Sequence, residues 1–152
     1  MINIEEIRRN PDIQDWNTIS ASKEISEEFI REFKYRVDWY CISVYKILSE
    51  DFIREFQDYV DWRLISLYEF LSENFIREFE DRLDWYTISS EQVLSESFIR
   101  EFQDKVSWNN ISLNQKLSKE FIVEFSNEIN FYYLIDNHHI SGEVMNFCRI
   151  FL

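Results

Sequence analysis

Two adjacent histidines, His138 and His139, are the first residues to test for chemistry, because imidazole binds metals and exchanges protons near neutral pH. Neighbouring residues on a helix point about 100° apart, which is poor geometry for holding one metal ion. No cysteine or carboxylate arrangement completes a site around them. The sequence therefore predicts a solvated turn at Asp136–His139, with a metal site as the weaker alternative, and predicts no cofactor.

The two cysteines, Cys41 and Cys148, are the next candidates, because a thiolate can act as nucleophile or metal ligand. Their spacing matches no metal motif and no disulfide framework, and neither has a partner that would mark an activated thiolate. The first ten residues are charged and contain no apolar stretch, so no signal peptide is expected. These features predict an intracellular protein that is not secreted.

Carboxylates are abundant, with 29 Asp and Glu against 16 Lys and Arg and a net charge of −13. No phosphate-binding glycine loop, nucleophile elbow or zinc-protease helix accompanies them, and no pair is singled out for acid–base work. The sequence therefore predicts that the protein is not an enzyme. Its negative charge argues against binding nucleic acid or an anionic membrane surface. No run of about 18 apolar residues is present to span a membrane.

A 23-residue repeat positions almost every residue of the chain. The string Phe-Ile-Arg-Glu-Phe recurs at this spacing from Phe29 to Phe102, and a fifth copy at Phe121–Phe125 has Val123 in place of the Arg. Tryptophans recur with the same spacing, and their phase with Ile and Leu predicts burial rather than ligand stacking. The predicted structural core of the repeats is Trp16, Trp39, Trp62, Trp85, Trp108, Phe29, Phe33, Phe52, Phe56, Phe75, Phe79, Phe98, Phe102, Phe121 and Phe125.

Each repeat also carries two residues that are typical of helix N-termini. One directly precedes the aromatic anchor, and the other is a serine ten residues after that anchor. Glutamates often follow the serine, where the helix dipole favours negative charge. The spacing therefore predicts two helix starts per repeat. The capping residues are Asp15, Asp38, Asp61, Asp84, Ser107 and Asn130, and Ser26, Ser49, Ser72, Ser95, Ser118 and Ser141.

A third serine lies in the helix that begins at the aromatic anchor, which we call the second helix of each pair. This helix is open to two interpretations. Ser66, Ser89 and Ser112 each stand three residues before a Glu or a Gln, which is the pattern of a capping box. The second helix either runs through this serine or breaks and restarts there.

The apolar spacing within a repeat is helical, as Phe52, Ile53, Phe56 and Val60 show by falling on one face. The single glycine and single proline also disfavour a sheet with many hairpins. One repeat buries too little apolar surface to fold alone, so neighbours must cover each other. We predict an all-α solenoid of stacked 23-residue helix–turn–helix repeats. It forms a single repeat domain, with a cap half-unit at 1–15, five regular repeats at 16–130 and a divergent repeat at 131–152.

The pattern Asp-Trp-x-x-Ile-Ser, followed by Leu-Ser-Glu-x-Phe-Ile-Arg-Glu-Phe, resembles repeat-containing proteins encoded by giant viruses that infect amoebae. Asp61–Ser66 and Leu71–Phe79 carry the resemblance, which covers residues 15 to 130 and, more loosely, the last repeat. It implies production inside a host cell, and hence the host cytoplasm. It implies no activity, because the function of that family is largely unassigned.

A repeated arginine would form a ladder if the repeats stack in register. An anion-binding stripe is one interpretation of it. The other is structural, because acidic residues would neutralise the charge. Asp58, Asp81 and Asp104 stand four residues after their arginines on the same helix face, and glutamates stand beside the ladder at Glu32, Glu55, Glu78, Glu101 and Glu124. We favour the structural interpretation. The arginines are Arg31, Arg54, Arg77 and Arg100.

Positions that differ between repeats are the candidates for binding a partner, because the fixed positions are accounted for by the fold. Tyrosine is enriched at protein interfaces, and burial between repeats is the equally weighted alternative for these side chains. The predicted partner-binding residues are Tyr40, Tyr45, Arg63, Tyr68 and Tyr86.

These observations predict a non-catalytic scaffold that binds another protein through a curved surface. One alternative is a structural or self-assembling protein, in a particle or filament, that forms a homo-oligomer through the apolar C-terminal half-unit. That half-unit contains Val144, Met145, Cys148 and Leu152. A weaker alternative is an acidic mimic of nucleic acid, although Arg and Lys are interspersed among the carboxylates.

Overall fold

The structure, a computed structural model, describes residues 2–148 and contains only helices and their connections within that range. Among the described residues, no helix has both the length and the apolar character that a membrane span requires. The helices are α1 (Ile4–Arg9), η1 (Pro11–Ile13), α2 (Trp16–Ala21), α3 (Glu27–Glu32), α4 (Trp39–Tyr45), α5 (Glu50–Glu55), α6 (Trp62–Tyr68), α7 (Glu73–Glu78), α8 (Trp85–Glu91), α9 (Glu96–Glu101), α10 (Trp108–Asn114), α11 (Lys119–Glu124), α12 (Phe131–Leu134) and α13 (Gly142–Cys148).

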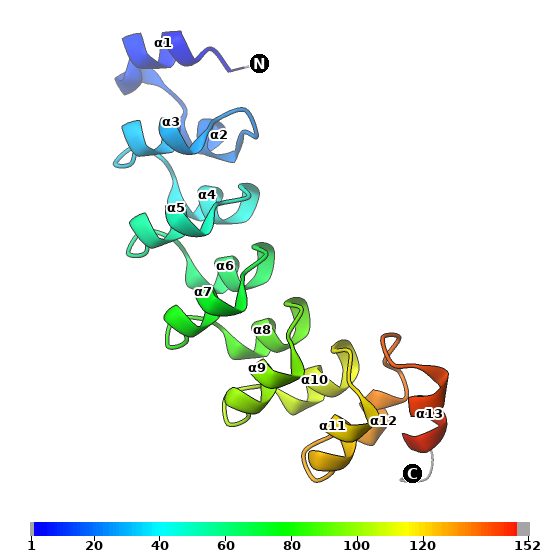
Figure 1. Cartoon of the computed structure of the whole chain (residues 1–152). Helices are drawn as coiled ribbons and strands as arrows, with labels where there is room; N and C mark the ends of the chain where they lie inside the picture. Colours follow the sequence, from blue (N-terminus) through cyan, green and yellow to red (C-terminus); the bar gives the residue numbers. More distant parts are fainter. Residues whose placement is uncertain (1, 149–152) are drawn as a thin grey trace. The chain divides into compact units, whose positions relative to one another are not determined.

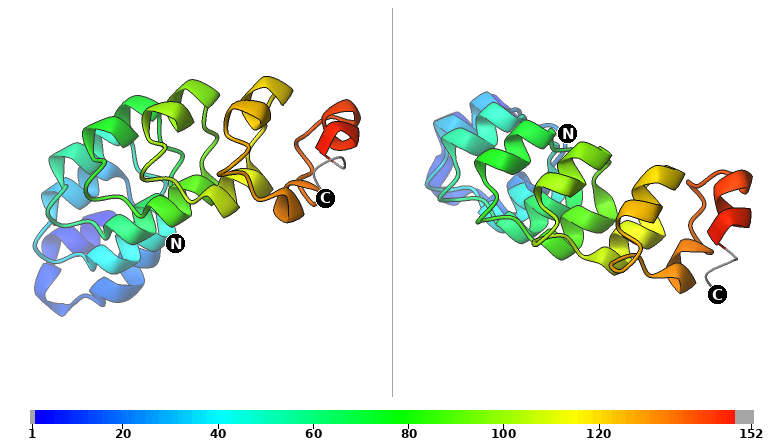
Figure 2. Two further views of the ribbon diagram at one scale, coloured as in Figure 1. Left: turned by 90° about the horizontal axis from the view of Figure 1, so that it is seen from below. Right: turned by 60° about the horizontal axis from the view of Figure 1, so that its bottom comes forward.

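The chain forms two compact units, unit 1 (Met1–Glu69) and unit 2 (Phe70–Leu152). In unit 1 the second helices of successive repeats pack on one another, α2 on α4 and α4 on α6 (Figure 1). In unit 2, α8 packs on α10, α10 on α12, and α12 contacts α13. Figure 2 shows from two further sides that the helix pairs of unit 2, coloured green to orange, follow one another. The predicted all-α solenoid of stacked repeats is confirmed.

Both predicted helix starts are present in each regular repeat. In the second repeat, Asp38 Oδ1 accepts a hydrogen bond from Cys41 N at 3.0 Å, and Ser49 Oγ accepts one from Phe52 N at 3.2 Å. Each satisfies a backbone N–H that the first turn of a helix leaves unpaired. Ser107 is an exception, because its side chain makes no such bond although α10 begins directly after it.

The first helix of each pair begins after the capping serine and holds the Phe-Ile-Arg-Glu-Phe motif. It ends at the second phenylalanine of that motif, without a glycine. Phe56 has φ −112° and ψ 28°, and its carbonyl accepts hydrogen bonds from Tyr59 N and Val60 N, which close a tight turn. No described residue has a positive φ. The chain can therefore make all its connections with a single glycine.

The serine of the apparent capping box does not cap or break a helix, so that interpretation is wrong. The helix runs through it: Ser112 lies inside α10, where its buried hydroxyl donates to Trp108 O at 2.7 Å and accepts from Asn130 N of the next repeat at 2.9 Å. Back-bonding to the preceding turn is a common use of serine within a helix. The hydroxyl thus joins two repeats, and Ser20, Ser43 and Ser89 do the same.

The core lies between the two helices of a pair and between successive pairs. Its fully buried members include Phe52, Phe75, Phe98, Phe121, Ile42, Ile65, Ile88 and Ile111. The tryptophans are half-buried at its edge. Trp39, for example, packs on Phe56 with ring centroids 5.0 Å apart and donates its indole N–H to Lys34 O at 2.9 Å. Phe33 and Phe125 are also half-buried.

The two ends of the repeat array differ. In α1, Glu6 stands at the position of the first phenylalanine of the repeat and is exposed. In α13, Val144 and Met145 are half-buried. The predicted apolar residue Leu152 and the side chain of Cys148 lie outside the part of the chain that the structure describes.

Candidate interaction surface

A row of buried polar side chains holds the linker that follows each second helix. Gln115 is the clearest case, because its Oε1 accepts a hydrogen bond from Leu94 N at 3.1 Å while its Nε2 donates to Ser89 O at 3.0 Å and Gln92 O at 2.7 Å. All three partners belong to the preceding repeat. Lys46, Glu69 and Gln92 occupy the same repeat position and are also buried.

The linker itself is extended, so its side chains alternate between the core and solvent. Lys46 has φ −106° and ψ 144°, and its side chain and that of Leu48 point inward and are buried. Ile47, between them, is 88% exposed. The equivalent residues of the next two repeats, Phe70 and Val93, are 90% and 95% exposed.

We define the linker surface of unit 1 as Tyr45, Ile47 and Tyr68. Tyr45 and Tyr68 are about half exposed and occupy equivalent positions at the ends of α4 and α6, which pack on each other. Tyr45 and Ile47 also line a hollow of ≈ 350 Å³ with Lys23, Ile25 and Lys46. Unit 1 therefore presents apolar and aromatic groups from two successive repeats, with a recess beside Tyr45 and Ile47.

Unit 2 contains a larger hollow of ≈ 590 Å³ next to its own linkers. Val93 and Leu117 contribute apolar groups from two successive linkers, and Val144 contributes one from α13. Lys116, Lys119, Glu120, Glu143 and His139 add charged or polar groups of both signs. This mixed lining singles out no ligand chemistry.

The five predicted partner-binding residues are all exposed, although Tyr45 and Tyr68 are also partly covered, and they do not share one face. Tyr40 and Arg63 lie one residue after the tryptophan, and Tyr45 and Tyr68 lie six residues after it. Five helical steps separate these positions by about 140° around the axis. Tyr86 is exposed on α8 of unit 2.

Ile47, Phe70 and Val93 were not among the predicted partner-binding residues. They stand eight residues after each tryptophan, where later repeats have Lys116 and His139. A signal was present, because a position that varies directly before the fixed Ile or Leu anchor is typical of an extended segment with alternate side chains outside.

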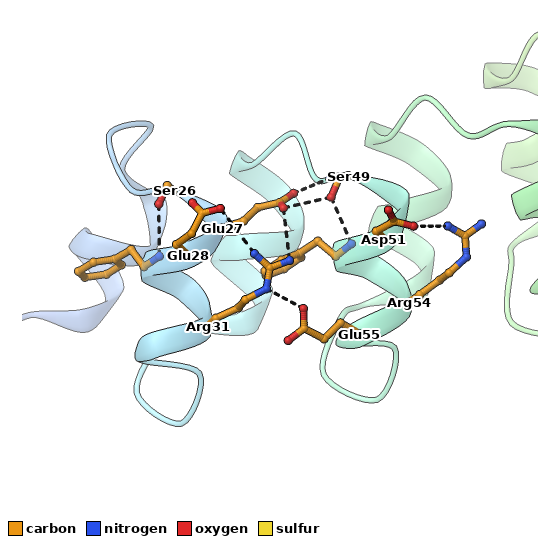
Figure 3. Close-up of polar contacts among 10 residues, drawn as sticks. Ser26, Glu27, Glu28, Arg31, Ser49, Asp51, Arg54 and Glu55 are labelled. Atoms are coloured by element: carbon orange, nitrogen blue, oxygen red, sulfur yellow. Dashed lines mark hydrogen bonds and ion pairs between the residues drawn. The ribbon is translucent and has the colours of Figure 1, made fainter.

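The arginine ladder forms within each unit, and its partners in the next repeat are the predicted glutamates rather than the predicted aspartates. Arg31 Nε lies 2.6 Å from Glu55 Oε2 of the next repeat, and the Arg31 guanidinium also lies within 3.8 Å of Glu27 and Glu28 (Figure 3). The hydrogen bond that Arg31 donates to Glu55 raises the pKa of Arg31. In unit 2, Arg77 pairs with Glu101 and Arg100 with Glu124, each at 2.8 Å.

The expected pairing of Arg77 with Asp81 and of Arg100 with Asp104 is wrong. The helix that holds Arg77 ends after Glu78, so Asp81 falls in the following turn instead of the next helical turn. Asp81 instead lies 3.1 Å from Lys105 Nζ, in the next repeat. Because carboxylates from two repeats surround Arg31, Arg77 and Arg100, these arginines do not form an open anion site. These half-exposed pairs define the register of stacking more than they add stability.

The residues first considered for chemistry do not assemble into a site. His138 and His139 are exposed in a turn, as predicted. Cys41 is half-buried, and burial raises the pKa of its thiol. Among residues 2–148, no group of three His, Cys, Asp or Glu side chains is arranged to hold a metal ion.

The fold and its surface define a class, the helical-repeat solenoids, in which a fixed framework presents variable exposed positions. No family model, curated protein or solved structure matches the chain. The resemblance to repeat proteins of giant viruses stays a prediction.

Proposed function

We propose that this protein is a non-catalytic scaffold that binds another protein, and that the linker surface of unit 1 is part of the binding site. One observation carries the proposal: Ile47 extends almost fully into solvent from a linker whose neighbouring residues are buried and hydrogen-bonded. An exposed aliphatic side chain beside two half-exposed tyrosines is the composition of an interface centre.

The linker is also held in place before any partner arrives. Lys46 Nζ donates to Ile25 O at 3.2 Å, Leu48 N donates to Glu69 Oε1 at 3.0 Å, and Ser49 N donates to Glu27 Oε1 at 2.7 Å. A surface that is fixed in this way loses little conformational entropy on binding. This favours recognition of a folded or helical segment over wrapping of the linker around a partner.

The charge around the linker surface indicates the chemistry of the partner. Two exposed carboxylates, Glu28 and Asp51, stand in the first turns of α3 and α5, and Asp51 follows Ile47 by only four residues. The chain as a whole has a net charge of −13. We therefore expect a partner that combines aliphatic or aromatic side chains with Lys or Arg.

The test replaces the linker surface and measures capture of a partner. The triple variant Tyr45→Ser, Ile47→Ser and Tyr68→Ser is expected to lose tenfold or more of its affinity, because each central side chain contributes about 1 kcal/mol or more to such an interface. Proteins retained by the immobilised chain from a lysate of the producing cells would be quantified by mass spectrometry. The leading ones would then be purified for titration.

The matched control is Tyr35→Ser, which removes a tyrosine that is more exposed than Tyr45 or Tyr68 from the turn after α3, outside the linker surface. It should capture the same proteins as the wild type, and circular dichroism should show all variants folded. Equal capture by the triple variant, or capture lost equally in the control, would refute this binding site.

The residues at the ends of the arginine ladder argue against end-to-end self-assembly. In α13, the last helix of the array, Asn146 stands where the repeat has its arginine, and Arg9 stands where it has the glutamate that receives that arginine. Two copies stacked head to tail would therefore bring Asn146 to Arg9, without an ion pair at that junction. We accordingly favour the scaffold over the filament or particle component. Light scattering at increasing protein concentration distinguishes the two, because a strict monomer counts against self-assembly.

A further inference from the structure

The repeat position that holds each linker is filled by an amide at Gln92 and Gln115 in unit 2, and in unit 1 by the amine of Lys46 and the carboxyl group of Glu69. Gln92 Oε1 accepts from Leu71 N at 3.0 Å, as Gln115 Oε1 does from Leu94 N. The amide nitrogen of Gln115 donates to two carbonyl oxygens of the preceding repeat, and so does that of Asn137, at 2.8 Å to Ser112 O and Gln115 O. An amide suits this position because it accepts and donates at once.

Glu69 occupies the same position in unit 1. It is 3% exposed, and its Oε1 accepts from Leu48 N at 3.0 Å, as in the amide-bearing repeats. The carbonyls equivalent to those that Gln115 binds are Ser43 O and Lys46 O, four and seven residues after Trp39. An ionised carboxylate has no proton to offer them, whereas a neutral carboxyl group has one.

We propose that Glu69 is a proton-dependent latch on the Lys46–Ser49 linker. In its neutral form the carboxyl group mimics glutamine, accepting from Leu48 N and donating to the backbone carbonyls of the preceding repeat. In its ionised form it cannot donate, its charge is buried, and the linker is released more often. No bond is made or broken apart from the transfer of one proton to solvent.

The surroundings of Glu69 support this assignment. Burial raises its pKa to about 7; the Leu48 N–H bond opposes that rise and the charge of Glu27 adds to it. Glu27 itself accepts from Ser49 N and Ser49 Oγ. Lys46, the nearest cation on the linker, directs its ammonium to Ser22 O and Ile25 O of the preceding repeat instead. Burial also lowers the pKa of Lys46.

The direction of the pH effect follows from these values. The pKa of Glu69 rises from 4.5 to about 7 on folding, so its stabilising effect is complete below pH 4.5 and is lost as the pH rises through about 7. Glu69 therefore releases the linker more often as the pH rises above about 7. Because Tyr45 and Ile47 flank Lys46, opening would also loosen the linker surface, and this consequence alone rests on the proposed function.

The test uses the full chain and needs no partner, so its failure is distinct from failure of the binding site. The carboxyl carbon of Glu69 would be followed by ¹³C NMR between pH 4 and 9. Hydrogen exchange of the Leu48 amide would be measured alongside, corrected for intrinsic exchange, with the Leu94 amide as the internal control because it donates to Gln115. We expect titration of Glu69 near pH 7 and a fall in Leu48 protection, relative to Leu94, of about tenfold or more from pH 5.5 to 8.5.

Two variants complete the test. Glu69→Gln should make Leu48 protection independent of pH, and Gln92→Glu should transfer the pH dependence to the Leu71 amide. A Glu69 carboxyl that titrates near its ordinary 4.5 would overturn the proposal. So would wild-type Leu48 and Leu94 amides that keep the same ratio of protection across this range.

Discussion

Replacing Phe98 with alanine is expected to lower the free energy of unfolding by about 3–5 kcal/mol. The ring is fully buried and packs between repeats. Within its own repeat it lies 4.7 Å from the ring of Phe102, and the guanidinium of Arg77, from the preceding repeat, lies 4.9 Å above its centroid. Truncation would leave a cavity lined by two repeats. Denaturant titration followed by circular dichroism measures the change.

Val93→Ala provides the matched control, because Val93 lies in the linker that leads to the same helix and is 95% exposed. Its effect on the free energy of unfolding should stay within about 0.5 kcal/mol. Comparable losses for Phe98→Ala and Val93→Ala would mean that the phenylalanines of the repeat are not its core.

Replacing Glu69 with glutamine is expected to raise the free energy of unfolding above pH 7 by about 3 kcal/mol, and to change it little at pH 4. The wild-type carboxyl has a pKa of about 7 when folded and 4.5 as its ordinary value, so ionisation disfavours the folded state as the pH rises between them. Glutamine removes that charge and already occupies the equivalent position in later repeats, as at Gln115. Thermal and denaturant unfolding at pH 4 and pH 8 measure the difference.

Glu91→Gln is the control for removing one negative charge, because Glu91 is exposed at the end of α8. It should alter the free energy of unfolding by less than about 0.5 kcal/mol at either pH. If the gain from Glu69→Gln were the same at pH 4 and pH 8, burial of a carboxylate would not be its cause.

Most of the fold could be predicted because its signals are local and repeated. The caps at Asp38 and Ser49 act on amides only three residues away, so residue type and spacing were sufficient to place both helix starts. The 23-residue period then predicted stacking, since helices of six or seven residues cannot persist alone.

The errors arose where a residue acts on the neighbouring repeat. Ser112 accepts from Asn130 N, 18 residues away, and Arg77 bonds to Glu101, 24 residues away. Both have a local partner in the sequence pattern, Gln115 in a capping box for the serine and Asp81 four positions on for the arginine, and the structure uses neither. Only the geometry of stacking decides between a local and a neighbouring partner.

The candidate surface was predicted in part for the same reason. Tyr45 and Tyr68 were identified because they vary between repeats, but their separation from Tyr40 around the helix requires the helix bounds. Ile47 was missed because its exposure depends on an extended linker, which is fixed by side chains such as Lys46 and Glu69 that reach across repeats.

The account depends most on the claim that a repeat folds only when its neighbours cover it. Circular dichroism of a peptide comprising residues 84–106, one full repeat with both caps, tests that claim directly. We expect less than about 20% helix in the peptide, because its two helices have only seven and six residues, while the intact chain is strongly helical. A peptide as helical as the same residues are in the structure would contradict the account.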